Sequence, residues 1–172
     1  RKQDHETLSN QLLSMGDTMF VETMSFKGLQ KRSKKTEKNE KGRFKKKKRF
    51  GRTLSNRAPS MLVSCLERKL KYHGLKLNKV NTAKVKASQY NHFDDTYTKK
   101  PLNKRWNDFN GIIVQRDLYS SFLLMNMVHD KDLDKIDREL CFKTFDLFLQ
   151  HHDELISKLK KEPHTLKSMG IR

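Results

Sequence analysis

The stretch GDTMFVETMSFKGL, residues 16–29, contains an unbroken apolar run at Met19–Val21 that ends directly on Glu22. A continuous apolar run without polar alternation is typical of a strand covered on both faces. We therefore predict a short strand at residues 18–23 that carries a carboxylate at its end. A lysine-rich tract follows almost at once, so this stretch joins a buried strand to the most basic part of the chain.

Helical and extended patterns alternate outward from this strand. Apolar residues recur at helical spacing in residues 5–16, 58–74, 117–128 and about 134–160, whereas residues 75–82 favour a strand. Helix, strand, helix and strand with short connections predict an α/β protein with a partly parallel sheet. The predicted apolar stripes are Leu8, Leu12 and Met15; Leu62, Leu66 and Leu70; Leu118, Phe122 and Met125; and Phe142, Phe145, Leu149, Leu155, Ile156 and Leu159.

The composition limits the class of protein. The 172 residues are enough for one ordinary domain with a core. The 38 Lys and Arg residues exceed the 20 Asp and Glu residues, which gives a formal net charge of +18. The sequence contains no run of about 18 apolar residues that would span a bilayer. A charge of this sign and size therefore indicates a polyanionic partner, nucleic acid before membrane.

Most of the excess charge lies in one tract, residues 27–57, which holds 15 Lys and Arg residues and 2 acids. Its self-repulsion and lack of aliphatic residues predict a mobile loop or lid that orders on an anion. The alternative is a solvated charge run. Phe44 and Phe50 lie among the lysines and favour nucleic acid, because aromatic rings stack on bases. The candidate nucleic-acid-binding residues are Lys31, Arg32, Lys34, Lys35, Arg43, Lys45, Lys46, Lys47, Lys48, Arg49 and Arg52.

The two cysteines, Cys65 and Cys141, both lie inside apolar helical patterns. Isolated thiols without CxxC spacing support neither a disulfide framework nor a zinc site. We expect both to be reduced core residues of a cytoplasmic protein.

Two acids are prominent by position. Glu22 ends a predicted buried strand, and Asp117 opens an apolar helix. Carboxylates gathered at the end of an apolar sheet are costly unless a cation compensates them. Two magnesium ions about 3.5–4 Å apart are what phosphodiester hydrolysis uses. A structural explanation also exists for each acid, because Glu22 can face solvent at the strand end and Asp117 can be a helix N-cap.

Two motifs and the segment between them resemble TnpB proteins, the transposon-encoded relatives of type V CRISPR effectors. FVETMSFKGL is similar to the second acidic motif of their RuvC-like nuclease domain, and RDLYSSFLLMN is similar to the third. RAPSMLVSCLERKLKYHGLKLNKVNT resembles the helix and strand between these motifs. The resemblance covers roughly residues 5–127 in the family's order.

The resemblance implies a partial RNase H-like (RuvC-like) α/β fold with a basic insertion and a carboxyl-terminal helical extension. Glu22 and Asp117 would be its catalytic, metal-binding carboxylates, using magnesium in a two-metal mechanism. The implied partners are a guide RNA and target DNA, without a membrane, in a cytoplasmic protein associated with the nucleoid. The implied domains are residues 1–83, with the second motif and a basic loop at 27–57; residues 84–113, a degenerate zinc ribbon; and residues 114–172, with the third motif and the last helix.

The sequence departs from the family in two places. Ser88, Asn91, Asn107 and Asn110 stand where a zinc ribbon has cysteines, so no zinc is expected, and packing of Tyr90, Phe93, Trp106 and Phe109 is expected instead. His92 alone is expected to be a surface or core histidine rather than a ligand. The first acidic motif is not recognisable either, since Asp4 and Asp17 lie in other contexts.

These departures lead to a specific expectation. The chain is interpreted as the carboxyl-terminal part of an RNA-guided DNA endonuclease, with an incomplete metal site and no activity in isolation. Two alternatives stay open. One is a nuclease-inactive relative that acts as an RNA-guided DNA-binding protein, and the other is a basic RNA-binding protein in which both acids are structural.

Overall fold

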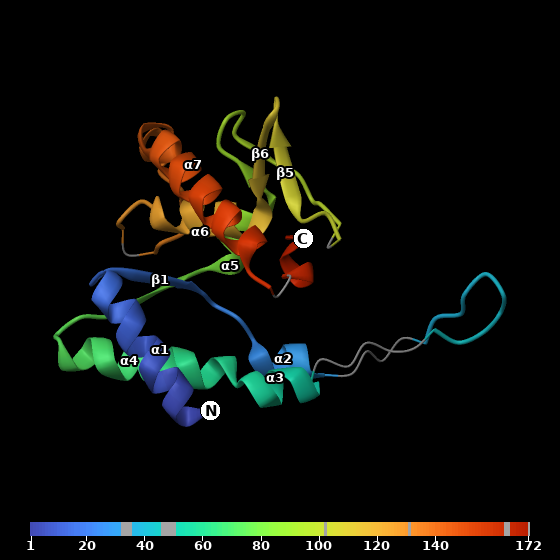
Figure 1. Cartoon of the computed structure of the whole chain (residues 1–172), viewed down its shortest axis with the longest axis horizontal. Helices are drawn as coiled ribbons and strands as arrows, with labels where there is room; N and C mark the ends of the chain where they lie inside the picture. Colours follow the sequence, from blue (N-terminus) through green and yellow to red (C-terminus); the bar gives the residue numbers. More distant parts are fainter. Residues whose placement is uncertain (32–35, 46–50, 102, 131, 164–165, 172) are drawn as a thin grey trace. The chain divides into compact units, whose positions relative to one another are not determined.

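The chain contains both helices and short strands, as Figure 1 shows in this computed structural model. The structure describes residues 1–31, 36–45, 51–101, 103–130, 132–163 and 166–171. The prediction that the chain mixes helices and strands, as in an α/β protein, is confirmed. Two compact units are formed, one by Arg1–Met19 with Thr23–Asn78 and the other by Phe20–Glu22 with Lys79–Arg172.

The described strands form three two-stranded sheets rather than one larger sheet. The predicted strand at residues 18–23 is present as β1 (Met19–Glu22), and it pairs with β2 (Leu77–Val80), the strand predicted at residues 75–82. The other two sheets are antiparallel hairpins, because their strands are joined by short local connections. They are formed by β3 (Tyr90–Asn91) with β4 (Thr96–Tyr97) and by β5 (Trp106–Phe109) with β6 (Ile112–Gln115).

The β5–β6 hairpin turns on two residues with positive φ angles. Phe109 pairs with Ile112, so only Asn110 and Gly111 lie in the turn, with φ angles of 53° and 94°. Asn-Gly is the preferred sequence for a two-residue turn of this handedness. Asp108 Oδ1 accepts a hydrogen bond from the Gly111 amide at 2.8 Å, which fixes the turn.

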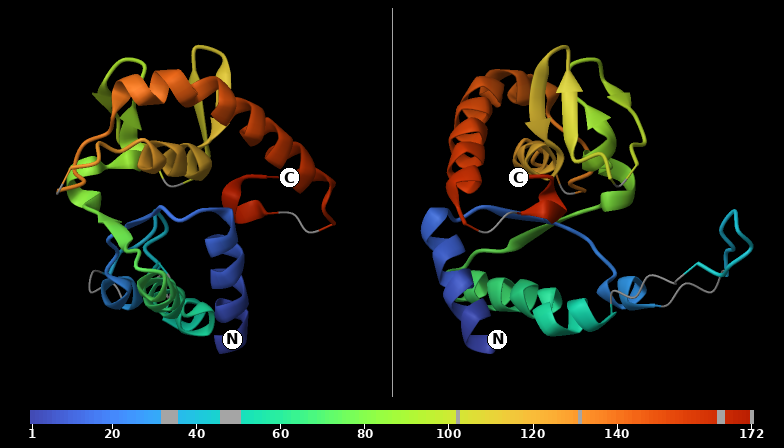
Figure 2. Two further views of the ribbon diagram at one scale, coloured as in Figure 1. Left: turned by 90° about the vertical axis from the view of Figure 1, so that its left-hand side faces the viewer. Right: turned by 45° about the vertical axis from the view of Figure 1, so that its right-hand side comes forward.

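The first unit is built mainly from helices. The two predicted helices are confirmed as α1 (Lys2–Met15) and α4 (Pro59–Tyr72), which pack against each other and cross in the views of Figure 2. Lys69 of α4 forms a salt bridge with Glu6 of α1, with 2.9 Å between Nζ and Oε2. Two shorter helices, α2 (Phe26–Gln30) and α3 (Gly51–Arg57), also contact each other.

The second unit holds the larger apolar core. Its helical elements are α5 (Thr82–Val85), a 3₁₀ turn η1 (Ala87–Gln89), α6 (Arg116–Met125), α7 (Arg138–Lys161) and a 3₁₀ turn η2 (Lys167–Met169). Helices α6 and α7 contact each other, and both contact β6 (Figure 1). The buried core consists of Val80, Val85, Ala87, Tyr90, Phe109, Val114, Tyr119, Phe122, Leu123, Met127, Cys141 and Phe145.

The buried face of α6 differs from the predicted stripe. Phe122 is buried as expected, but Met125 is 71% exposed, and Tyr119 and Leu123 are buried instead. Tyr119 is held in the core by a hydrogen bond of 2.7 Å between its hydroxyl and the buried ring of His92. Helix α7 begins at Arg138 rather than near residue 134, because the Asp137 side chain accepts from the Leu140 amide at 2.9 Å and caps the helix.

The cysteines are free and buried, as predicted. Burial raises the pKa of the Cys141 thiol to about 12, with a smaller contribution from Asp137. Within the described ranges, no helix combines the length and apolar character needed to cross a bilayer.

Candidate functional site

Glu22 is the last residue of β1, as the sequence predicted. Its side chain is partly buried, and burial raises the pKa of its carboxyl above the ordinary value. A carboxylate in this setting is stabilised by any cation that reaches it, because desolvation disfavours the charged form. Glu22 therefore retains one property expected of a metal ligand.

Asp117 lies in the first turn of α6, and its side chain is 48% exposed. The alternative prediction that Asp117 is the N-cap of this helix is wrong. Gln115 caps the helix instead, since its Oε1 accepts from the amides of Asp117 at 2.7 Å and Leu118 at 2.8 Å. The Asp117 carboxylate accepts a hydrogen bond from Gln115 Nε2 at 3.3 Å and lies 3.6 Å from Arg116 Nε.

Gln115 is a fully buried residue that sequence reasoning missed. Besides its contacts with α6, its Nε2 donates to the Met169 carbonyl at 3.2 Å. The backbone amide of Gln115 donates to Nε2 of His152 at 2.9 Å. The proton of the neutral His152 ring is therefore on Nδ1, which donates to Asp153 Oδ1 at 2.8 Å. Gln115 thus joins the start of α6, helix α7 and the carboxyl-terminal segment.

Glu22 and Asp117 are in different local environments. Burial is the cause of the raised pKa of Glu22, whereas Asp117 interacts with Gln115 and Arg116. Across the part of the chain that the structure describes, no group of three or more His, Cys, Asp and Glu side chains is placed to hold a metal ion. A two-metal centre needs several shared carboxylates. The described residues therefore do not by themselves fit such a centre, and Glu22 and Asp117 supply at most a part of it.

Residues 84–113, which were expected to be a degenerate zinc ribbon, contain side-chain hydrogen bonds and packed aromatic rings. Asn91 Oδ1 accepts from the Phe93 amide at 3.1 Å, and Asn107 Oδ1 accepts from Lys100 Nζ at 2.7 Å. The expected ring packing is present between Phe93 and Phe109, whose centroids are 5.4 Å apart. Trp106 packs elsewhere, because its indole lies 6.2 Å from the His152 ring and donates to the Gly170 carbonyl at 3.1 Å.

His92 is a core histidine, one of the two roles expected for it. Its ring is fully buried, and Tyr119 Oη lies 2.7 Å from Nδ1 and also accepts from the His92 amide at 3.2 Å. The hydroxyl therefore donates to Nδ1, which leaves the proton of the neutral ring on Nε2, an atom without a hydrogen-bond partner among the described residues. Burial, with a smaller effect of Arg138, lowers the pKa of His92 to about 4.

The described parts of the basic tract contain two helices and a hairpin. Helices α2 and α3 hold its two ends, and a hydrogen-bonded hairpin forms at residues 37–45, drawn in cyan in Figure 1. Four predicted nucleic-acid-binding residues, Lys31, Arg43, Lys45 and Arg52, are described, and all four are exposed. The others, Arg32, Lys34, Lys35, Lys46, Lys47, Lys48 and Arg49, lie outside the described residues, as does Phe50.

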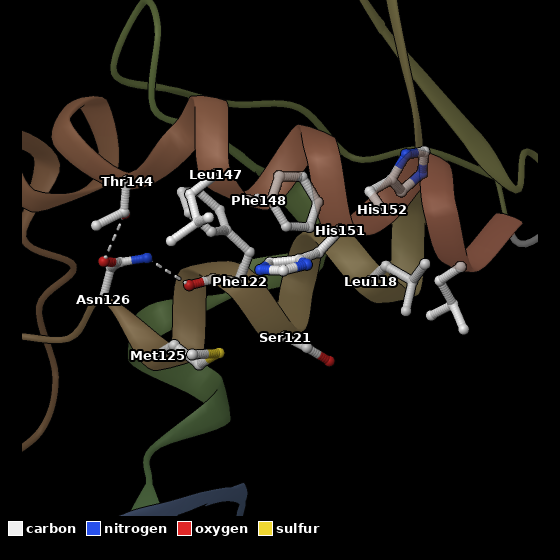
Figure 3. Close-up of a pocket in the computed structure, with 11 residues that line it drawn as sticks. Leu118, Ser121, Phe122, Met125, Asn126, Thr144, Leu147, Phe148, His151 and His152 are labelled. Carbon is white, nitrogen blue, oxygen red and sulfur yellow. Dashed lines mark hydrogen bonds between the residues drawn. The ribbon is translucent and has the colours of Figure 1, made fainter. Parts of the chain in front are cut away.

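An apolar groove of about 360 Å³ runs between α6 and α7, as the close-up in Figure 3 shows. Phe122, Leu147 and Phe148 line it, and a hydrogen bond of 3.1 Å from Thr144 to Asn126 lies at one end. Glu22 and Asp117 are not among its lining residues. Its one buried polar ring, His152, is already engaged by Gln115, so the groove offers apolar surface rather than acid–base chemistry.

No protein-family model matches the chain, and neither a curated protein nor a solved structure matches it.

Proposed function

We propose that the chain is a nucleic-acid-binding part of a transposon-associated, RNA-guided DNA endonuclease of the TnpB type. In this proposal it carries the second and third acidic motifs of a RuvC-like, RNase H-like domain, with the basic tract as an insertion and α7 as a helical extension. Guide RNA and target DNA are the proposed partners, in the cytoplasm at the nucleoid. Base pairing supplies the sequence choice, and the protein supplies contacts to the backbone.

One observation carries the binding part of the proposal. Residues 27–57 hold 15 basic residues against 2 acidic ones, and the described members, including Lys31, Arg43 and Arg52, are exposed. Cations that are exposed and close together in sequence bind phosphates mainly by releasing counterions, so affinity falls steeply with salt. A solvated charge run that binds nothing predicts no such dependence.

The nuclease part rests on the motif resemblance and on the partly buried carboxylate of Glu22. When bound, magnesium would supply charge neutralisation and an activated water at the scissile phosphate. Glu22 and Asp117 are the residues of this chain that would hold it. Because the described residues do not form a complete centre, we propose that the chain alone does not cleave DNA.

Fluorescence anisotropy with a labelled RNA strand and a labelled DNA duplex, measured over a series of salt concentrations, tests the binding. The test variant replaces Lys31, Arg43, Lys45 and Arg52 with glutamine. We expect the slope of log K against log salt to fall by about 0.7–0.9 for each phosphate that the variant no longer neutralises. The matched control replaces four exposed lysines of α7, Lys143, Lys158, Lys160 and Lys161, and should leave the slope unchanged. Equal slopes in all three proteins would remove these four residues from the interface.

The contacts of Asp117 favour one alternative, a basic RNA-binding protein whose acids are structural. Its carboxylate interacts with Gln115 and Arg116 within the same helix start. In that alternative, Asp117→Asn lowers the free energy of unfolding and leaves RNA affinity unchanged. In a nuclease, Asp117→Asn leaves stability almost unchanged, because the N-cap belongs to Gln115.

A further inference from the structure

The hairpin at residues 37–45 has a defined backbone. The Lys45 amide donates to the Glu37 carbonyl at 2.8 Å, and the Asn39 amide donates to the Arg43 carbonyl at 2.8 Å. The Asn39 side chain accepts from the amides of Lys41 at 3.1 Å and Arg43 at 2.9 Å, which closes the turn. Such bonds fix the directions in which neighbouring side chains leave the hairpin.

Phe44 is the large apolar residue of this hairpin, and it is 70% exposed. It forms an isolated antiparallel bridge with Lys38, so the two side chains leave the same face of the hairpin. Lys38 Nζ lies 5.1 Å from the centre of the Phe44 ring, a cation–π contact. The ring is thus oriented by one cation while most of its surface stays open to solvent.

Further basic residues lie next to Phe44 in the sequence. Arg43 and Lys45 flank Phe44 in sequence, and Lys45 interacts with Glu37, with 3.5 Å between Nζ and Oε2. Arg43 has an exposed side chain and no ionic partner among the described residues. An open aromatic ring beside cations is the combination that binds unpaired nucleic acid, where a base stacks on the ring and phosphates contact the cations.

Resting on the proposed function, we propose that the hairpin at residues 37–45 binds single-stranded nucleic acid by stacking an unpaired base on Phe44. Lys38 orients the ring, and Lys38 and Arg43 contact the adjacent phosphates. In a duplex, both faces of each base are covered by neighbouring pairs, so the ring has no free base face to contact. The hairpin therefore distinguishes unpaired from paired strands, which the charge of the tract alone does not.

An abasic strand separates stacking from charge, because it keeps every phosphate and lacks the bases. Anisotropy is measured with the full chain, a labelled adenine strand, an abasic strand of equal length and a duplex, in DNA and RNA forms. We expect the adenine strand to bind between about 5 and 150 times more tightly than the abasic one. Phe44→Ala should reduce this ratio to near one and leave duplex affinity and the salt slope unchanged, and Phe44→Tyr should preserve the ratio.

Tyr72 is the matched control, since it is an aromatic residue of the same unit and is 75% exposed. Tyr72→Ala should leave the ratio at its wild-type value. Two results would overturn the stacking inference: a ratio near one in the wild-type chain, or a ratio that Phe44→Ala does not change. In either case, salt-dependent binding would still support the proposed function. Failure of every strand to bind overturns the proposed function itself. A ratio that is equal for DNA and RNA identifies the base face as the feature bound, because the base is what both adenine strands have and both abasic strands lack.

Discussion

Gln115 and Asp117 hold each other at the start of α6. The amide of Asp117 donates to Gln115 Oε1 at 2.7 Å, and the carboxylate of Asp117 accepts from Gln115 Nε2 at 3.3 Å. The glutamine is fully buried and the aspartate is half exposed. The buried partner therefore supports the helix, and the exposed partner stays accessible to a ligand.

This difference in burial predicts that removing the Gln115 side chain lowers the free energy of unfolding more than removing the Asp117 side chain does. Gln115→Ala removes the N-cap and leaves the Met169 carbonyl without its donor, so we expect the free energy of unfolding to fall by about 1–3 kcal/mol. Asp117→Ala keeps the cap and should cost less than about 1 kcal/mol. Urea unfolding followed by circular dichroism measures both. Gln150→Ala, on the exposed side of α7, serves as the control. Similar losses for Gln115→Ala and Asp117→Ala would show that the aspartate is itself structural.

The sequence predicted some of the local elements and missed others. The strand ending on Glu22 and helices α1 and α4 lie where apolar periodicity placed them. Helix α4 buries Leu66 and Leu70 of its predicted stripe, whereas Leu8 and Met15 of α1 are exposed. The two predicted strands, β1 and β2, pair with each other, whereas the β3–β4 and β5–β6 hairpins were not predicted. One local signal was overlooked, since Asn110-Gly111 between apolar runs predicts the β5–β6 hairpin directly.

The candidate site shows the same limit. The position of Glu22 at a strand end is confirmed, because it follows from a local pattern. The role of Gln115 could not be predicted from the sequence. It depends on hydrogen bonds with Met169 and His152, which are remote in sequence. In the basic tract, composition did not indicate the turn that the Asn39 side chain closes. Asn at the start of a turn is a signal that the charge run obscured.

The buried His92 predicts a loss of stability in acid. Burial lowers its pKa from 6.5 to about 4 in the folded chain, so the unfolded chain binds the proton more tightly. Between these two values, stability therefore falls as the pH falls. The loss should approach roughly 3 kcal/mol near pH 4, since each unit of pKa shift corresponds to about 1.4 kcal/mol. Urea unfolding at a series of pH values measures this loss.

His92→Phe removes this titrating group while keeping an aromatic ring among Phe93, Phe122 and Phe145. We expect the variant to show a flatter dependence of stability on pH between 4 and 6.5. His73→Gln, at an exposed position, is the control and should keep the wild-type dependence. An unchanged dependence in His92→Phe would assign the acid sensitivity to other groups.

Cys141 should resist thiol reagents in the folded chain. Its side chain is fully buried, and burial raises its pKa to about 12, so little thiolate is present at neutral pH. We expect reaction with a disulfide reagent to follow unfolding, and to become fast in urea. Cys65→Ala isolates the signal of Cys141, and Ser121→Cys, at an exposed position of α6, provides a fast reference. Fast native labelling of Cys141 would show that the core around α7 opens readily.

Gly111 should be the most sensitive residue of the β5–β6 turn. Its φ angle of 94° is one that L-residues rarely adopt, and a Cβ added there would meet no atom within 4 Å, so the cost of Gly111→Ala is backbone strain alone. We expect a loss of about 1–2 kcal/mol in the free energy of unfolding. Gly16→Ala is a matched control, because Gly16 also has open space but an extended φ angle of 169°. It should be neutral or slightly stabilising, since alanine reduces the entropy of the unfolded chain. Equal effects of the two substitutions would contradict the positive φ angle at Gly111 and with it the two-residue turn.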